Sequence, residues 1–151
     1  MALGDRMVVI ENGGVVQTGT PAEVTARPRS QYVADLTGVN LLRGAAHGTV
    51  LELDGGGQLT CRSHASGPAL AVIAPAAVSV SRQRPEGPQE NTWPGQISAV
   101  DLMGDRVRVR IDGTPPITAE VAPAAVDELK LDDGGELWAT VSPAAITVYP
   151  P

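Results

Sequence analysis

The chain has 151 residues, of which 42% are hydrophobic and 19% are charged, and its formal net charge is −6 at pH 7. That length allows one medium domain or two small ones, each with an apolar core. The acidic balance argues against binding to the phosphate backbone of nucleic acids, because such binding needs clustered Lys and Arg. No apolar stretch reaches the roughly 20 residues that a membrane-spanning helix requires.

Aromatic residues and cysteines are scarce. Aromatic side chains make up 3% of the chain and Phe is absent, so the core must be built from Val, Leu, Ile and Ala, which favours short strands. Cys61 is the single cysteine, which fits a reducing cytoplasm. We find no basic region followed by an apolar run at the N-terminus, so we expect a cytoplasmic chain without an export signal.

The first forty residues predict a β-hairpin followed by two short helices. Residues 7–10 and 15–18 are apolar strands around an Asn-Gly turn. Residues 20–23 carry a capping Thr, a Pro at the first helical position and a Glu three residues after the cap, which indicates a helix start. A second helical stretch, residues 30–36, should end at Gly38.

From residue 41 onward the pattern changes to short strands separated by turns rich in Gly and Pro, which is typical of small β-barrels or sandwiches. The polar, Pro-rich and Gly-rich segment that follows Arg82 predicts a linker or a long exposed loop. We therefore expect four parts: a hairpin with short helices in residues 1–40, a first module in 41–82, a linker in 83–94 and a second module in 95–151.

The two β modules resemble an internal repeat. Residues 71–80 (AVIAPAAVSV) align with residues 139–148 (ATVSPAAITV) at a constant shift of 68 positions, the difference between Pro143 and Pro75. At the module starts, Gly48 aligns with Gly95 and the apolar positions that follow also match. Chance similarity is the alternative interpretation.

Three arginines alternate with apolar residues in the second module. The segment RVRVRI, residues 106–111, predicts a strand with one apolar and one basic face. Guanidinium groups are planar forks of donors that can hold an anion, whereas ordinary solvated arginines on a wet sheet face are the alternative. Cys61, His47 and His64 have irregular spacing, which favours structural or surface positions over a nucleophile or a metal site.

Residues 3–40 resemble the end of an ABC ATPase domain. The resemblance rests on residues 3–24 (LGDRMVVIENGGVVQTGTPAEV) and continues through Pro28, Tyr32, Val33, Ala34, Gly38 and Asn40. Residues 44–150 are similar to the OB-like regulatory modules, called TOBE or Mop-like, of importer ATP-binding subunits. The segments MGDRVRV, ITAEV, VDEL and LWATV in residues 103–141 most resemble the molybdate and sulfate importer branch.

This resemblance implies a mainly β fold of tandem OB-like barrels behind a hairpin and helices left from an ATPase domain. It implies a regulatory and dimerisation role in an oxyanion importer subunit that works with a membrane permease, and no nucleic acid partner. A stand-alone Mop-like oxyanion-binding protein, or the regulatory domain of a sugar, polyamine or iron importer ATPase, are the alternatives. In a whole subunit, residues 7–36 should rest on the ATPase core. We therefore expect exposed apolar side chains at Met7, Val9, Val16, Tyr32 and Val33.

Two departures from the family pattern limit the predicted chemistry. The sequence contains no Gly-rich phosphate loop, Walker-B strand or Leu-Ser-Gly-Gly signature, so we expect no catalysis by this chain and assign ATP and magnesium to the full subunit. Oxyanion-binding Mop domains carry a Ser-Ala-Arg-Asn stretch and a later Lys, where this chain has residues 90–94 (ENTWP) and Ser142. If an anion binds, Thr118 and Ser142 are the candidate donors, and no metal site is expected.

Overall fold

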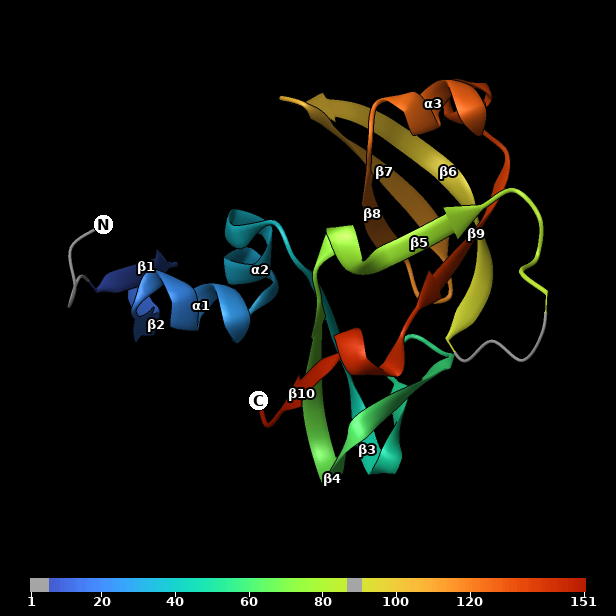
Figure 1. The fold of residues 1–151 in the computed structure, drawn as a ribbon. Helices are drawn as coiled ribbons and strands as arrows, with labels where there is room; N and C mark the ends of the chain where they lie inside the picture. Colours follow the sequence, from blue (N-terminus) through green and yellow to red (C-terminus); the bar gives the residue numbers. More distant parts are fainter. Residues whose placement is uncertain (1–5, 87–90) are drawn as a thin grey trace.

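The computed structural model describes residues 6–86 and 91–151. In this part of the chain, strands form three antiparallel sheets, and short helices lie at the N-terminal side and in the turns. Figure 1 shows the first hairpin and the helices α1 and α2 on one side of a β body built from the two larger sheets. The expected mainly β fold is therefore confirmed.

The N-terminal elements follow their local sequence signals. Strands β1 (Met7–Glu11) and β2 (Gly14–Gly19) pair as a hairpin. Helix α1 (Pro21–Ala26) begins after Thr20, whose hydroxyl oxygen accepts a hydrogen bond from the Glu23 N–H at 3.2 Å. Helix α2 (Gln31–Thr37) ends at Gly38, which adopts the left-handed conformation with φ of 74°.

The expected apolar surface of this N-terminal arm, residues 6–39, is only partly correct. Met7 and Tyr32 are exposed, whereas Val9 and Val33 are buried because they form a small core with Val24. Successive strand residues point to opposite faces, so the outward face of the hairpin carries different residues from those predicted. These exposed residues are Val8, Ile10 and Val15. The predicted side chain of Val16 lies outside the part that the structure describes.

The β body contains eight strands within the described residues. These are β3 (Asn40–Leu53), β4 (Gln58–Ile73), β5 (Val78–Ser81), β6 (Thr92–Met103), β7 (Arg106–Gly113), β8 (Ile117–Val121), β9 (Glu136–Val141) and β10 (Thr147–Tyr149). One sheet has the order β10-β4-β3 and the other has the order β5-β9-β6-β7-β8. The shorter elements are α3 (Ala124–Glu128) and the single turns η1 (Pro75–Ala77), η2 (Leu131–Asp133) and η3 (Pro143–Ala145).

Each half of the β body gives its last strand to the other half. Strand β5 follows the β3–β4 hairpin in sequence but pairs with β9, whereas the C-terminal strand β10 pairs with β4. A Pro-Ala-Ala turn precedes both exchanged strands, as the aligned segments predicted. Strand pairing joins the two halves in space. Of the predicted linker, residues 92–94 belong to β6, and residues 87–90 lie outside the described part of the chain.

The two halves begin at equivalent asparagines, not at the predicted glycines. Asn40 is paired with Ile73, and the Asn91 carbonyl accepts a hydrogen bond from the N–H of Val141, the residue equivalent to Ile73. Asn40 thus corresponds to Asn91, and Gly44 rather than Gly48 corresponds to Gly95. The alignment was displaced because apolar residues alternate along a strand, so a shift by an even number of residues keeps the pattern in phase.

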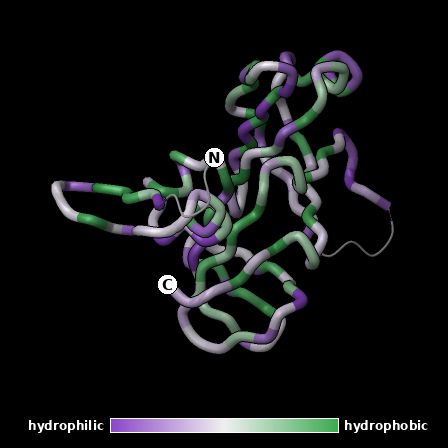
Figure 2. Tube along the Cα trace, turned by 60° about the vertical axis from the view of Figure 1, so that its left-hand side comes forward, coloured by the Kyte–Doolittle hydropathy of each residue, from purple (hydrophilic) through white to green (hydrophobic). Residues whose placement is uncertain are grey.

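One aliphatic core fills the space between the two sheets. Its fully buried members come from both halves and include Leu51, Leu59, Ile73, Val109, Ile111 and Leu137. Trp93 is also buried, and its indole N–H donates to the Pro115 carbonyl at 2.9 Å. Figure 2 shows the hydrophobic positions within the strands, whereas hydrophilic positions gather around α3 at the top of the view.

Candidate functional site

A hollow of about 330 Å³ lies where the N-terminal arm meets the second half of the β body. Its walls come from α2, the start of β3, and the strands β7 and β8. The polar residues of its lining are Gln31, Asp35, Asn40, Arg110 and Thr118. We call this hollow the seam pocket, because both halves of the β body contribute to it.

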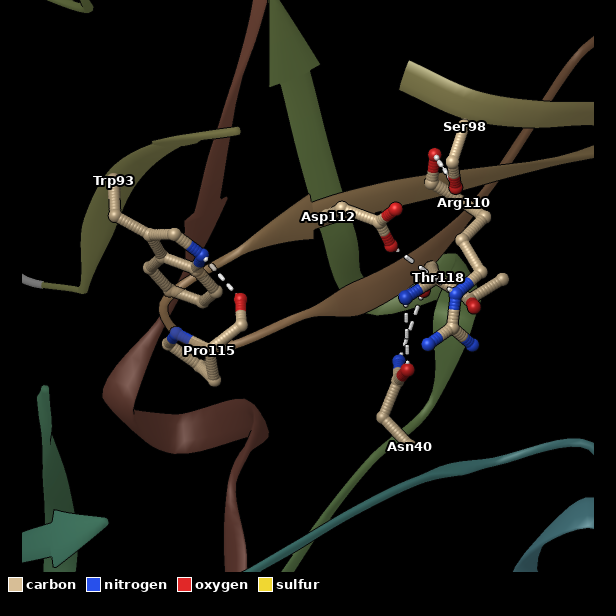
Figure 3. A network of polar contacts seen from close by, with 7 residues as sticks. All are labelled: Asn40, Trp93, Ser98, Arg110, Asp112, Pro115 and Thr118. Carbon is tan, nitrogen blue, oxygen red and sulfur yellow. Dashed lines mark hydrogen bonds and ion pairs between the residues drawn. The ribbon is translucent and has the colours of Figure 1, made fainter. Parts of the chain in front are cut away.

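Asn40 joins the two halves in the wall of the seam pocket. Its Nδ2 donates to the Thr118 carbonyl at 2.9 Å, and the Thr118 N–H donates to its Oδ1 at 2.9 Å (Figure 3). Strand β8 stands at the end of its sheet, so its outward backbone groups need partners from elsewhere. The Asn40 amide supplies both partners and acts as one rung of β pairing.

Asn91 makes the same double hydrogen bond from the second half to the first half. The Thr60 N–H donates to Asn91 Oδ1 at 2.7 Å, and Asn91 Nδ2 donates to the Thr60 carbonyl at 2.8 Å. Because Thr60 belongs to the first half and Asn91 opens the second, each half holds a strand of the other through an asparagine. The paired hydrogen bonds of Asn40 and Asn91 therefore reinforce the exchange of β5 and β10.

The arginine row on β7 is largely engaged with neighbouring groups. Arg106 Nε lies 3.9 Å from a carboxylate oxygen of Glu120, and Arg110 Nε lies 3.5 Å from Asp112 Oδ1 (Figure 3). The Arg108 guanidinium lies against Gly38. Exposed pairs of this kind stabilise the fold little, but they reduce the positive charge that an incoming anion would meet.

The two predicted donors lie in different places. Thr118 lines the seam pocket, and its backbone is held by Asn40. Ser142 is exposed and caps η3, where its Oγ accepts a hydrogen bond from the Ala144 N–H at 3.4 Å. The strand exchange separates them, because η3 packs on β4 whereas β8 packs on η1. Their role in anion binding stays a prediction.

Sequence reasoning missed the role of Arg82, which follows the exchanged strand β5. Its guanidinium donates to four backbone carbonyls in the second half, at 2.6 to 3.0 Å. These carbonyls belong to Leu129, Lys130, Gly134 and Glu136. No local pattern indicates this contact, because Arg82 stands at the edge of a polar segment and all four carbonyls are more than forty residues away.

The described residues contain no cluster of His, Cys, Asp and Glu that could hold a metal ion. Cys61 is buried, and this burial raises the pKa of its thiol, which disfavours the reactive thiolate. His47 and His64 are both exposed. Within the same part of the chain, no helix is long and apolar enough to cross a bilayer.

Comparison with known proteins finds similarity to import ATP-binding proteins. Residues 87–148 match the TOBE domain. The chain is 30% identical to the molybdenum import ATP-binding protein ModC of Mycobacterium tuberculosis, over 98% of this chain and 42% of the relative. It is 26% identical to the molybdate/tungstate import ATP-binding protein WtpC of Pyrococcus abyssi, over 99% of this chain and 44% of the relative. The sulfate/thiosulfate import ATP-binding protein CysA of Bacillus cereus is 30% identical over 99% of this chain and 42% of its own length.

A solved structure supports the fold. The cytoplasmic molybdate-binding protein ModG superposes with a TM-score of 0.63 at 19% identity, covering 74% of this chain and 96% of that protein. The expected architecture of OB-like modules is thereby confirmed. The chain spans less than half the length of the curated relatives that it matches. The chain is thus similar to the TOBE-containing, C-terminal part of ABC importer ATP-binding subunits.

Proposed function

We propose that this chain is the regulatory and dimerisation region of an importer ATP-binding subunit that serves an oxyanion such as molybdate or sulfate. The observation that carries the proposal is the 30% identity to a molybdenum import subunit across 98% of the chain. Relatives named for tungstate and sulfate import support the same class of solute. ATP hydrolysis would belong to the rest of such a subunit, at the cytoplasmic face of a permease.

The outer face of the first hairpin supports attachment to an ATPase domain. Val8, Ile10 and Val15 are 55%, 58% and 62% exposed, and Ile10 lies opposite Val15 in the hairpin. Three adjacent aliphatic side chains are a surface that water solvates poorly, and such patches mark contacts with another protein surface. We assign this face to contact with the nucleotide-binding part of the subunit.

The tip of the β6–β7 hairpin supports pairing with a second copy. Leu102 and Met103 are 71% and 54% exposed there, at the end of the two strands farthest from the strand exchange. Long, flexible apolar side chains such as Met are common at protein interfaces. A symmetric contact between two such tips would make a dimer with a closed interface.

Calorimetric titration with molybdate, tungstate and sulfate, combined with light scattering, tests the proposal. We expect saturable anion binding and a mass of twice 15.6 kDa. Leu102→Ser with Met103→Ser should reduce the mass to that of a monomer without changing thermal stability. Val8→Ser with Ile10→Ser is the matched control and should leave the dimer intact. A monomeric wild-type chain that binds none of the three anions would contradict the proposed function.

A further inference from the structure

Three arginines surround Tyr149 where the N-terminal arm meets the sheet of β3, β4 and β10. Arg27 and Arg29 come from the loop between α1 and α2, and Arg43 comes from β3. The carbon at the centre of the Arg27 guanidinium lies 5.8 Å from the centroid of the Tyr149 ring, within the range of a cation–π contact. Burial raises the pKa of Tyr149 to about 12, while the positive charges of Arg27, Arg43 and Arg29 oppose that rise.

These arginines have no acidic partners. Among the described residues, no carboxylate forms an ion pair with any of the three. The whole chain carries six more negative than positive charges, so acidic groups were available to compensate them. The arginines therefore create a local positive potential on an acidic protein, which attracts anions.

The loop that carries Arg27 and Arg29 is held from several sides. Gln17 is 9% exposed, and its side chain donates to the Arg27 carbonyl at 2.8 Å and accepts from the Arg29 N–H at 2.9 Å. The Tyr149 hydroxyl donates to the Pro28 carbonyl, and the Arg43 guanidinium donates to the Arg29 carbonyl at 3.3 Å. All these contacts fix the loop backbone, and within the described chain they leave the guanidinium donors of Arg27 and Arg29 without hydrogen bonds.

A hollow lies beside these free donors. It has a volume of about 410 Å³ and is lined by Gln17, Thr18, Glu23, Ala26, Arg27 and Arg29. Thr18 is exposed and offers a hydroxyl donor. Glu23 is the one carboxylate of the lining, and it already accepts a hydrogen bond from the Thr20 hydroxyl at 3.0 Å. Two guanidinium groups against one carboxylate leave the hollow positively charged.

We propose that this hollow, the arm pocket, binds a tetrahedral oxyanion of the molybdate and sulfate class between the guanidinium groups of Arg27 and Arg29. The inference rests on the proposed function, since the ligand is of the same class as the proposed transported solute. The planar fork of a guanidinium matches two oxygens of such an anion, and Thr18 supplies a third donor. All the lining residues belong to the arm, so the bound anion would lie on the arm and brace the loop whose Pro28 carbonyl accepts the Tyr149 hydrogen bond.

Titration of the whole chain with sodium molybdate and sodium sulfate at constant ionic strength tests this site. We expect the double variant R27Q/R29Q to bind about tenfold more weakly or worse, because it loses two charge-assisted contacts. The variant R27K/R29K keeps the charge but loses the forks, so its affinity should lie between wild type and R27Q/R29Q. Far-UV circular dichroism and the thermal midpoint of each variant verify that the fold is retained.

Two single variants serve as controls: R62Q tests for a general effect of lost positive charge, and R110Q tests whether the anion binds at the seam pocket instead. R62Q removes an exposed arginine of β4 outside the arm pocket and should change affinity less than about twofold, as expected for long-range electrostatics alone. An equal loss in R62Q and R27Q/R29Q would overturn the inference. Lost binding in R110Q with full binding in R27Q/R29Q would also overturn it, while leaving anion sensing in place at the seam pocket. Absence of anion binding in the wild type would overturn the proposed site in the arm pocket. The dimerisation role would then be tested by the mass from light scattering alone.

Discussion

Gly44 and Gly95 occupy equivalent positions at which the fold leaves no room for a side chain. A Cβ at Gly44 would clash with the Glu52 carbonyl oxygen, and one at Gly95 would lie 2.5 Å from a methyl carbon of Ile111. We predict that Gly44→Ala and Gly95→Ala each lower the free energy of unfolding by about 3 kcal/mol, because backbone must move to admit the methyl group. Urea denaturation measures the loss.

Gly55 provides the matched control for these two substitutions. A Cβ there would have no atom within 4 Å, and the backbone conformation is one that alanine adopts without strain. We expect Gly55→Ala to change the free energy of unfolding by less than about 0.5 kcal/mol. A cost at Gly55 equal to that at Gly44 would show that close backbone approach is not the cause.

Tyr149 should make the protein sensitive to alkaline pH. Burial raises its pKa to about 12 in the folded chain, against about 10 in an unfolded chain. The folded state therefore holds its proton more tightly, so the stabilisation is complete below pH 10 and is lost as pH rises from 10 to 12. We predict a loss of about 1–3 kcal/mol over this window. Tyr149→Phe should remove this component from thermal unfolding midpoints measured between pH 9 and 12. An unchanged alkaline loss in that variant would assign it to another group.

At the scale of elements, local signals predicted the arm well. The turn between β1 and β2, the cap at Thr20 and the stop at Gly38 each depend on residues within a few positions of one another. The strand exchange could not be predicted in this way, because β5 and β10 could each pair within their own half or with the other half. The same Pro-Ala-Ala turn precedes β5 and β10, and the strands β4 and β9 that could receive them share one pattern, so own-half and cross-half pairing look alike.

The candidate sites were harder to predict, because their members meet only after the elements have packed. Thr118 was identified as a possible donor, but its hydrogen-bond partner Asn40 lies 78 positions away. Arg27 and Arg29 are positioned by Tyr149, which lies at the other end of the chain and holds their loop against the sheet. Neither composition nor strand periodicity reports contacts of this range, so these sites were accessible only through the structure.

At the scale of the whole molecule, the exchange makes the two halves depend on each other. The core contains buried residues from both halves, and Ile146, just before β10, belongs to it. Tyr149 in β10 is buried in a second cluster with Ala34, Leu41, Leu70 and Val72, which also ties the arm to the sheet. Loss of one exchanged strand therefore removes packing from the arm, the first half and the shared core together.

We predict that deletion of residues 146–151 destabilises the whole molecule rather than the first half alone. The loss of Ile146 and Tyr149 should lower the thermal midpoint by about 10 °C, since each buried side chain of this size contributes roughly 1.5–3 kcal/mol. Trp93 and Trp138 lie on β6 and β9 of the other sheet, so their fluorescence reports on the sheet that loses no strand in the deletion. Because the core is shared, the midpoint from tryptophan fluorescence should fall together with the midpoint from far-UV circular dichroism. Deletion of the exposed residues 150–151 alone is the control and should leave both midpoints unchanged. A tryptophan transition that keeps its wild-type midpoint in the longer deletion would mean that the halves fold independently despite the exchange.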